Sequence, residues 1–225
     1  MSAIAFGIPM QFDKCYLEGI SSLTSEDIRY AEELGYRVKL LGITRRAANG
    51  IELRVHPTLI PESRLIANVN GVMNAVLAKG DAVGPTLYYG AGAGSLPTAS
   101  AVVADIVDVT RLATADPEHR VPHLAFQPEC IADLPILPIE EIETSYYLRV
   151  PVVDRPGVLA KVATILSERG INIESIMQKE AEEQDGLVPL ILLTHRVTEQ
   201  SMNDAISALE ALADVSGSVM RIRVE

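Results

Sequence analysis

The sequence predicts an α+β protein: a mixed sheet with covering helices, then a linker, then a smaller domain of β-α-β-β-α-β order. Residues 36–89 contain about four strand patterns and few long helices. Residues 114–143 are rich in proline and acidic residues, which is typical of a linker. Strand and helix patterns resume at Tyr146. The predicted segments are therefore 1–113, 114–143 and 144–225.

Size and charge narrow the classes of function. The chain has 225 residues, a net charge of −11 and 48% hydrophobic residues, which allows one large or two modest domains. The acidic balance argues against nucleic acid and against an anionic membrane surface as partners. No run is long enough for a transmembrane helix. Cys15 and Cys130 lack metal-ligand spacing, so we expect no metal site and a reduced, cytoplasmic compartment.

The first domain begins with an apolar stretch, residues 1–8, that resembles the end of a helix stopped near Gly7. No basic region precedes it, so we do not expect a secretory signal. Because the stretch has no cap or turn at its start, we expect either a piece of a longer protein or a start codon placed late. Thr24-Ser25-Glu26-Asp27 predicts a capped helix start, and Gly35 predicts its end. Asn49-Gly50 predicts a hairpin turn. Extended segments are expected at 12–20, 36–43, 51–56, 69–78 and 85–89, with one or two helical turns at 61–67.

The glycine stretch Gly90–Asp105 (GAGAGSLPTASAVVAD) leads from the last of these strands into an apolar helix. The expected buried stripe of that helix is Ala101, Val102, Ile106 and Val109. A Gly-rich loop that opens a helix presents free N–H groups and the positive end of the helix dipole, which suits a phosphate. Taken alone, the stretch is a weak signal, and a mobile turn before a core helix is the more frequent explanation of it.

The last 80 residues predict two strand-helix-strand repeats. The strands are expected at 146–152, 171–179, 187–194 and 217–224, and the helices at 158–169 and 198–212. Asp154–Gly157 and Asp185-Gly186 are turns, and Gly170 ends the first helix. The inward side chains of that helix are Leu159, Val162, Ile165 and Leu166. This order predicts a ferredoxin-like sandwich.

Two sequence pieces in this segment, Val152–Leu159 and Gly170–Ile173, resemble the ACT domain family. The resemblance implies a paired regulatory module that binds small amino acids between copies. It assigns an effector site to Asp154, Gly157, Val158, Leu159 and Asn172. The chemistry agrees, since Gly157 at a helix start offers N–H groups to a carboxylate, while Asp154 and Asn172 suit an ammonium group. The alternative is that Asp154 is only a helix N-cap and Asn172 only a strand-entry residue.

Residues 1–115 resemble the C-terminal half of the catalytic core of homoserine dehydrogenases, whose bacterial members commonly carry a C-terminal ACT domain. The matching pieces are Ser2–Gly7, Glu18–Ser21, Asp27-Ile28, Ala31–Tyr36, Lys39–Gly42, Asn74–Val76, Gly90–Gly94 and Pro97-Thr98. The resemblance implies the interconversion of L-homoserine and L-aspartate 4-semialdehyde with NADP or NAD. It places this step on the route to threonine, isoleucine and methionine, with an amino acid, expected to be threonine, as feedback effector.

The resemblance also implies cofactor contacts and an assembly. It assigns cofactor binding to Gly90, Gly92, Ala93, Gly94 and Thr98, and it implies a homodimer or homotetramer. The family's Rossmann half and its catalytic lysine have no counterpart here. Lys39 does not match the catalytic position, and Glu18 is expected to be structural. We therefore predict no catalytic residue in this chain and no activity of the chain alone.

Two other functions stay open at this point. The chain could act as a non-catalytic amino-acid-binding module. It could also be a dimer scaffold, in which the apolar residues 1–10 need a partner surface.

Overall fold

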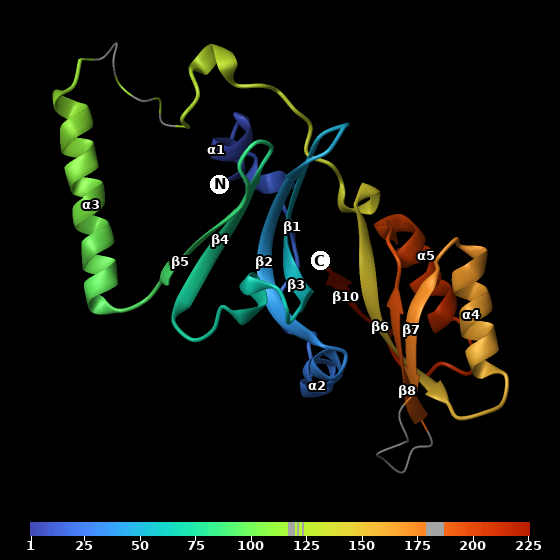
Figure 1. The fold of residues 1–225 in the computed structure, drawn as a ribbon. Helices are drawn as coiled ribbons and strands as arrows, with labels where there is room; N and C mark the ends of the chain where they lie inside the picture. Colours follow the sequence, from blue (N-terminus) through green and yellow to red (C-terminus); the bar gives the residue numbers. More distant parts are fainter. Residues whose placement is uncertain (117–119, 121, 123, 179–186) are drawn as a thin grey trace. The chain divides into compact units, whose positions relative to one another are not determined.

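The computed structural model describes residues 1–116, 120, 122, 124–178 and 187–225 (Figure 1). The chain forms two compact units, each made of two separate stretches of sequence. The first unit is Met1–Met10 with Glu62–Asp133, and the second is Gln11–Pro61 with Leu134–Glu225. The α+β class predicted from the sequence is confirmed. The segment boundaries at 113 and 144 stay predictions, and the expected Asp185-Gly186 turn lies outside the described residues.

The first unit is built around a two-stranded antiparallel sheet, in which Met73 pairs with Ala91 and Gly80 with Gly84. Its elements are α1 (Ser2–Phe6), η2 (Leu65–Asn68), β4 (Met73–Gly80), β5 (Gly84–Ala91), α3 (Ser95–Thr114) and η4 (Pro128–Cys130). As predicted, α1 stops at Gly7, which has a left-handed φ of 60°. A Cβ at Gly7 would meet the ring of Phe126, so glycine is needed there for both conformation and space.

Helix α3 corrects one prediction. The expected buried stripe is exposed: Val102, Ile106 and Val109 are between 51% and 65% exposed, and no residue of α3 is buried. The amphipathic pattern shows which face of a helix is apolar, but it does not show which surface covers that face. The described residues of the first unit leave this face uncovered.

The second unit is built around an eight-stranded mixed sheet. Its strands are β1 (Tyr16–Leu17), β2 (Tyr36–Arg46), β3 (Ile51–Pro61), β6 (Glu143–Val153), β7 (Ile173–Gln178), β8 (Leu187–Thr194), β9 (Val197–Thr198) and β10 (Met220–Val224). Its helices are η1 (Phe12–Lys14), α2 (Ser25–Glu33), η5 (Ile139–Glu141), α4 (Val158–Glu168) and α5 (Glu199–Glu210). The main strand order is β1-β3-β10-β6-β8-β7. The part β10-β6-β8-β7, with α4 and α5, has the predicted ferredoxin-like order.

The sheet runs without interruption from the C-terminal strands into the β2–β3 hairpin. Strand β10 pairs with β3 in parallel, with Arg223 opposite Thr58 and Val224 opposite Leu59. The hairpin turns at Asn49-Gly50 as predicted, and Arg46 pairs with Ile51. The C-terminal strands are therefore hydrogen-bonded directly to the N-terminal half of the chain.

Strand β3 is longer than predicted, because the sequence suggested an end before Pro57. The carbonyl of Val55 accepts a hydrogen bond from Glu18 N–H, and the carbonyl of Leu59 accepts one from Glu225 N–H. Alternate residues of a strand face the same neighbour, so the nitrogen of Pro57 faces that edge too. There β1 has ended and β10 is only beginning, so the missing N–H of Pro57 is tolerated.

Each face of the C-terminal sheet carries its own core. Under α4 and α5, one face packs Tyr146, Leu148 and Val150 of β6 with their neighbours. The opposite face packs Tyr147, Ile191, Leu193 and Ile222 against Tyr30 and Ala31 of α2. The alternation of β6 thus places its odd and even residues in different cores.

Helix α4 agrees with the sequence except at its start. Val162 and Leu166 are buried and Ile165 packs against the core, as predicted. Leu159, expected inward, is 41% exposed. It lies in the first turn of α4 and lines the pocket described below.

Candidate functional site

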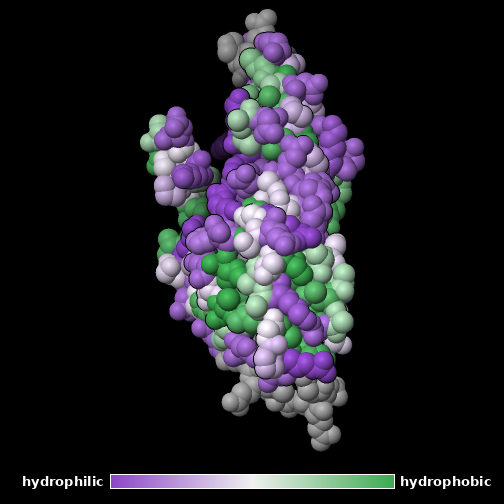
Figure 2. Space-filling model, turned by 90° about the vertical axis from the view of Figure 1, so that its right-hand side faces the viewer, coloured by the Kyte–Doolittle hydropathy of each residue, from purple (hydrophilic) through white to green (hydrophobic). Residues whose placement is uncertain are grey.

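A pocket of about 360 Å³ lies where β6 ends and α4 begins. It is lined by Val152, Val153, Asp154, Arg155, Pro156, Gly157, Val158, Leu159, Gln178 and Leu190. Its walls therefore combine apolar side chains with a carboxylate, an amide and the start of a helix. Figure 2 shows that hydrophobic residues gather in the lower half of the face that carries α4.

The first turn of α4 is open toward a ligand because no side chain caps it. Gly157 is the N-cap residue, with φ 90° and no side-chain hydrogen bond to the helix. The first N–H groups of a helix attract anions when no side chain caps them. Asp154 is not the N-cap, since its Oδ1 instead accepts a hydrogen bond from Gln178 Nε2 at 3.5 Å. The carboxylate of Asp154 and the helix start thus offer opposite charges to a small zwitterion.

The structure brings four of the five predicted effector residues together. Asp154, Gly157, Val158 and Leu159 line the pocket, whereas Asn172 does not. Asn172 is exposed, and its carbonyl accepts the His195 N–H at 2.9 Å. Sequence reasoning missed Gln178, which reaches the pocket because it pairs with Leu190 on β8. The sequence does not show which residues pair across the two strands.

The glycine stretch of the first unit is partly committed to the hairpin. Gly90 belongs to β5 and pairs with Asn74, and Gly92 N–H donates to the carbonyl of Val72 at 3.0 Å. A Cβ at Gly92 would overlap the amide end of the Asn74 side chain, which would have to move to admit it.

The open end of the stretch is the start of α3. Gly94 is the N-cap, with φ 120° and no side-chain cap. Thr98 N–H donates to the Gly94 carbonyl at 3.1 Å. A 20-residue helix with an uncapped start suits an anionic group such as a phosphate, so Ala93 and Gly94 fit a nucleotide better than Gly90 or Gly92. Thr98 can add only its hydroxyl, because its N–H is already bonded.

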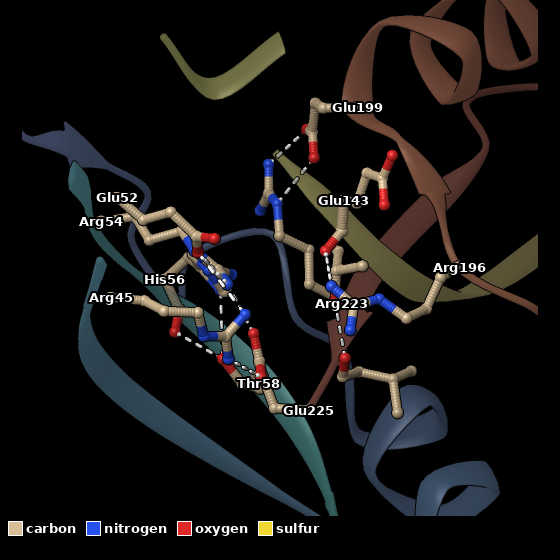
Figure 3. A network of polar contacts seen from close by, with 12 residues as sticks. Arg45, Glu52, Arg54, His56, Thr58, Glu143, Arg196, Glu199, Arg223 and Glu225 are labelled. Carbon is tan, nitrogen blue, oxygen red and sulfur yellow. Dashed lines mark hydrogen bonds and ion pairs between the residues drawn. The ribbon is translucent and has the colours of Figure 1, made fainter. Parts of the chain in front are cut away.

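A buried charged network lies where β10 joins β3 (Figure 3). Arg223 is fully buried and points toward Glu199 at the start of α5. Its guanidinium contacts both Glu199 oxygens, and its Nη1 lies 2.8 Å from Glu18 Oε2. Tyr16 O–H donates to Glu18 at 2.7 Å, and Tyr146 O–H donates to Glu199 at 2.8 Å. Arg223 therefore ties α5 to β1.

A second cluster lies beside it, where Arg45, Glu52 and Arg54 converge near Glu225 (Figure 3). Burial alone would raise the pKa of Glu225, but Arg54 and Arg45 hold it below its ordinary value. The pKa of Glu18 is also below its ordinary value. Burial raises this pKa, but the hydrogen bonds from Arg223 and Tyr16 lower it by more. Both carboxylates are therefore held ionised as ion-pair partners.

His56 sits inside this cluster as a neutral imidazole. Arg54 Nη1 lies 2.8 Å from His56 Nε2, and an arginine can only donate, so Nε2 must be the acceptor. His56 Nδ1–H then donates to the Pro57 carbonyl at 2.9 Å. Burial, and then the charges of Arg223 and Arg54, lower the pKa of His56 to about 4, against the Pro57 hydrogen bond. None of these residues lines the pocket, and the contacts of Glu18 agree with its expected structural role.

The described residues contain neither a metal-ligand cluster nor a membrane-spanning helix. Among them, no three His, Cys, Asp or Glu side chains lie close enough to hold a metal ion. Within the same residues, no helix is long and apolar enough to cross a membrane.

Two family models match the chain in succession. The model for homoserine dehydrogenase matches residues 1–107, and the model for the ACT domain matches residues 146–214. Residues 1–107 belong to the homoserine dehydrogenase family, and residues 146–214 are an ACT domain. The pocket thus lies within the ACT domain.

Proteins named homoserine dehydrogenase match this chain over its whole length. The homoserine dehydrogenase of Pseudomonas aeruginosa is 73% identical over 225 residues, which cover 100% of this chain and 52% of that protein. That of Neisseria gonorrhoeae is 59% identical with the same coverage. The crystal structure of a homoserine dehydrogenase from Thiobacillus denitrificans has a TM-score of 0.91 and 69% identity over 100% of this chain and 50% of that one. The chain therefore spans about half the length of the curated relatives it matches.

The ACT domain does not stand apart from the homoserine dehydrogenase segment. Strand β10, which follows the matched ACT residues and pairs with β6, also pairs with β3 of that segment, and the sheet face opposite α4 and α5 packs on α2. The Arg223 network crosses the same junction. Backbone, core and charged contacts all join the two families' segments within the second unit.

Proposed function

We propose that this chain forms part of a homoserine dehydrogenase, an oxidoreductase that interconverts L-homoserine and L-aspartate 4-semialdehyde with NADP or NAD. The observation that carries the proposal is the homoserine dehydrogenase segment followed by an ACT domain. Relatives that are 73% and 59% identical bear that enzyme's name, which supports it. The step belongs to the synthesis of threonine, isoleucine and methionine, and its proposed place is the cytoplasm.

The glycine stretch is the proposed cofactor contact. The nicotinamide cofactor supplies the hydride chemistry when it is bound. Ala93, Gly94 and Thr98 would face its anionic groups from the uncapped start of α3. Gly90 and Gly92 would contribute by lacking side chains, since their backbones already serve the hairpin. The uncovered apolar stripe of α3 is then the proposed contact with a nucleotide-binding half.

The ACT pocket is the proposed effector site, with L-threonine as the effector. The N–H groups of Gly157 and Leu159 would bind the carboxylate, beside Val158, whose own N–H donates to the Arg155 carbonyl at 3.4 Å, and Asp154 would bind the ammonium group. Gln178 adds an amide beside Asp154. Asn172 lies outside this pocket, so its proposed role requires a second copy of the domain, in a homodimer or homotetramer.

Two measurements on the purified chain test these proposals. In the first, the chain is mixed with homoserine and NADP, and the absorbance of the reduced cofactor is followed. We expect no increase in this absorbance, because no catalytic residue is predicted in these 225 residues. Robust turnover would overturn that expectation. In calorimetry against a panel of amino acids, we expect heat with L-threonine and weaker binding by Asp154→Asn. Asp204→Asn, an exposed aspartate on α5, is the matched control and should bind like the wild type.

A second candidate function is a non-catalytic amino-acid-binding and dimerisation module. The pocket inside the ACT domain favours it, because that site is formed by this chain's own residues. The test is made on the full-length protein that contains this chain. If that protein binds an amino acid but does not turn over homoserine, it is a binding module and not a regulated dehydrogenase.

A further inference from the structure

One buried carboxylate of the homoserine dehydrogenase segment is held by the ACT domain. Asp27 of α2 is fully buried and accepts a bidentate pair of hydrogen bonds from Arg149 of β6. Arg149 Nε lies 2.7 Å from Asp27 Oδ1, and Nη2 lies 3.1 Å from Oδ2. Tyr147 O–H adds a hydrogen bond to Oδ1 at 3.2 Å. Bidentate arginine–carboxylate pairs are among the strongest polar contacts in proteins.

The same carboxylate also begins helix α2. Asp27 Oδ2 accepts from Thr24 N–H and Thr24 O–H, and Thr24 Oγ1 in turn accepts from Asp27 N–H. This reciprocal capping box satisfies backbone groups that the first turn of a helix leaves free. Asp27 therefore serves two structures at once, so any change in Arg149 must alter the first turn of α2.

Arg149 lies on the strand that ends in the effector pocket. Val152 and Val153 of β6 line the pocket, and Asp154 follows them directly. Arg149 is three residues before Val152, and three residues of a strand span about 10 Å, so Arg149 lies about 10 Å from the pocket lining. Between them, residues 150–153 pair with β8 on one side, and on the other side β10 pairs only as far as Arg149, beyond which Val152 forms a single bridge to Val215. A ligand that orders the end of β6 therefore acts on a stiff element that carries Arg149.

Arg149 is partly exposed and lies beside a second carboxylate at the surface, whereas Arg223 is fully buried. The Arg149 side chain is 18% exposed, and its Nη1 lies 3.8 Å from Glu26, which is 47% exposed. Releasing Arg223, which is fully buried on a Glu199 that is 2% exposed, would strand a buried charge. Releasing Arg149 would strand the buried Asp27 as well, unless the first turn of α2, where Thr24, Ser25 and Glu26 are exposed, opens to water with it. The contact through Arg149 is therefore the movable one, and the contact through Arg223 is the fixed one.

We propose that the Asp27–Arg149 pair is the switch by which the occupied pocket acts on the homoserine dehydrogenase segment. In one state, Arg149 holds Asp27 and the first turn of α2 is capped and docked. In the other, Arg149 pairs with Glu26 and solvent, and that turn opens. An effector at the end of β6 favours the docked state. This inference rests on the proposed effector site.

The test is amide hydrogen exchange of the full 225-residue chain, with and without saturating L-threonine, on samples titrated in parallel by calorimetry. The peptide covering residues 24–33 reports on α2. In the wild type, we expect threonine to slow its exchange about five-fold or more, the usual lower range of coupling between sites. Exchange there that is unchanged although calorimetry shows binding overturns the proposal.

Variants separate the switch from the site. Glu26→Gln removes the second partner of Arg149 at an exposed position, so α2 should exchange slowly even without threonine. Arg149→Lys keeps the charge but loses the bidentate geometry, so α2 should exchange fast while threonine still binds. Glu32→Gln, on the same helix in an exposed pair with Arg37, is the control and should respond like the wild type.

The outcomes distinguish the two proposals. If no amino acid gives heat, the effector site itself is wrong and this inference falls with it. If threonine binds and Glu26→Gln exchanges and responds like the wild type, the effector site stands and the switch is wrong.

Discussion

Replacing Arg223 by methionine should destabilise the second unit strongly. Methionine fills much of the same volume, but it removes the guanidinium that faces Glu199, Glu18 and Tyr16. The Glu199 side chain is 2% exposed, so its carboxylate would remain in the protein interior without its main partner. An uncompensated buried charge is far more costly than the pair is stabilising.

The magnitude follows from what Glu199 keeps. Breaking a buried pair by removing one partner costs about 3 to 5 kcal/mol. Tyr146 O–H and Arg221 still contact Glu199, and Arg221 lies 2.9 Å from its Oε1. The expected loss is therefore at the lower end, about 3 kcal/mol. Arg37→Met, in a pair whose side chains are 43% and 52% exposed, is the matched control and should cost less than about 1 kcal/mol.

Urea unfolding, followed by circular dichroism and by hydrogen exchange of β6 and β10, measures both variants. The double variant Arg223→Met with Glu199→Gln removes the stranded charge, so it should recover about 1 to 2 kcal/mol relative to Arg223→Met. The reasoning is refuted if Arg223→Met costs no more than Arg37→Met, or if the double variant is no more stable than the single one.

Three further predictions concern acid stability, the helix start and the sheet face. The unfolded chain takes up a proton at His56 near pH 6.5 while the folded chain stays neutral to about pH 4, so the stability due to this group is present above pH 6.5 and is lost as the pH falls toward 4. At about 1.4 kcal/mol per pKa unit, the loss of unfolding free energy approaches 3 kcal/mol. The urea midpoint should therefore fall less steeply between pH 7 and pH 4 for His56→Gln than for the wild type. Equal slopes for the two proteins would contradict the neutral imidazole. Gly157→Ala should destabilise the second unit by about 1 to 2 kcal/mol, because a left-handed backbone is costly for alanine even though a Cβ there meets no atom within 4 Å. Gly19→Ala, equally open but without a positive φ, is the control, and an equal effect of both would exclude backbone strain as the cause. Residues 144–225 expressed alone should bind a hydrophobic dye and self-associate, because Tyr147, Ile191, Leu193 and Ile222 lose the cover of α2; a stable monomer that binds no dye would show that the ACT domain does not need that cover.

Local signals in the sequence predicted most elements of the fold. Thr24 and Asp27 form the predicted cap, and Asn49-Gly50 forms the predicted turn. Strand β8 has the predicted bounds, Leu187–Thr194. These features depend on contacts between residues close in sequence, so a short window of sequence contains their cause.

The features that sequence reasoning missed depend on distant partners. Pro57 continues a strand because β1 and β10 leave a gap beside it. Gln178 reaches the pocket through its pairing with Leu190. Arg223 looks like a surface residue of an alternating strand, yet it is fully buried because Glu199 and Glu18 approach from two other elements.

The candidate effector site was predictable in part for the same reason. Asp154, Gly157, Val158 and Leu159 are neighbours in the chain, so one turn brings them together. The position of Asn172 depends on where the start of a separate strand lies, which the sequence does not show, and Asn172 lies outside the pocket. The switch at Asp27 was not visible, because its arginine lies more than a hundred residues away in the sequence.

The most direct test of the account is a crystal structure of the chain grown with L-threonine. We expect electron density for the amino acid in the pocket between β6 and α4, with its carboxylate on the N–H groups of Gly157 and Leu159 and its ammonium group on Asp154. Density for threonine elsewhere, with this pocket empty at a saturating concentration, would contradict the effector site on which the regulatory account depends.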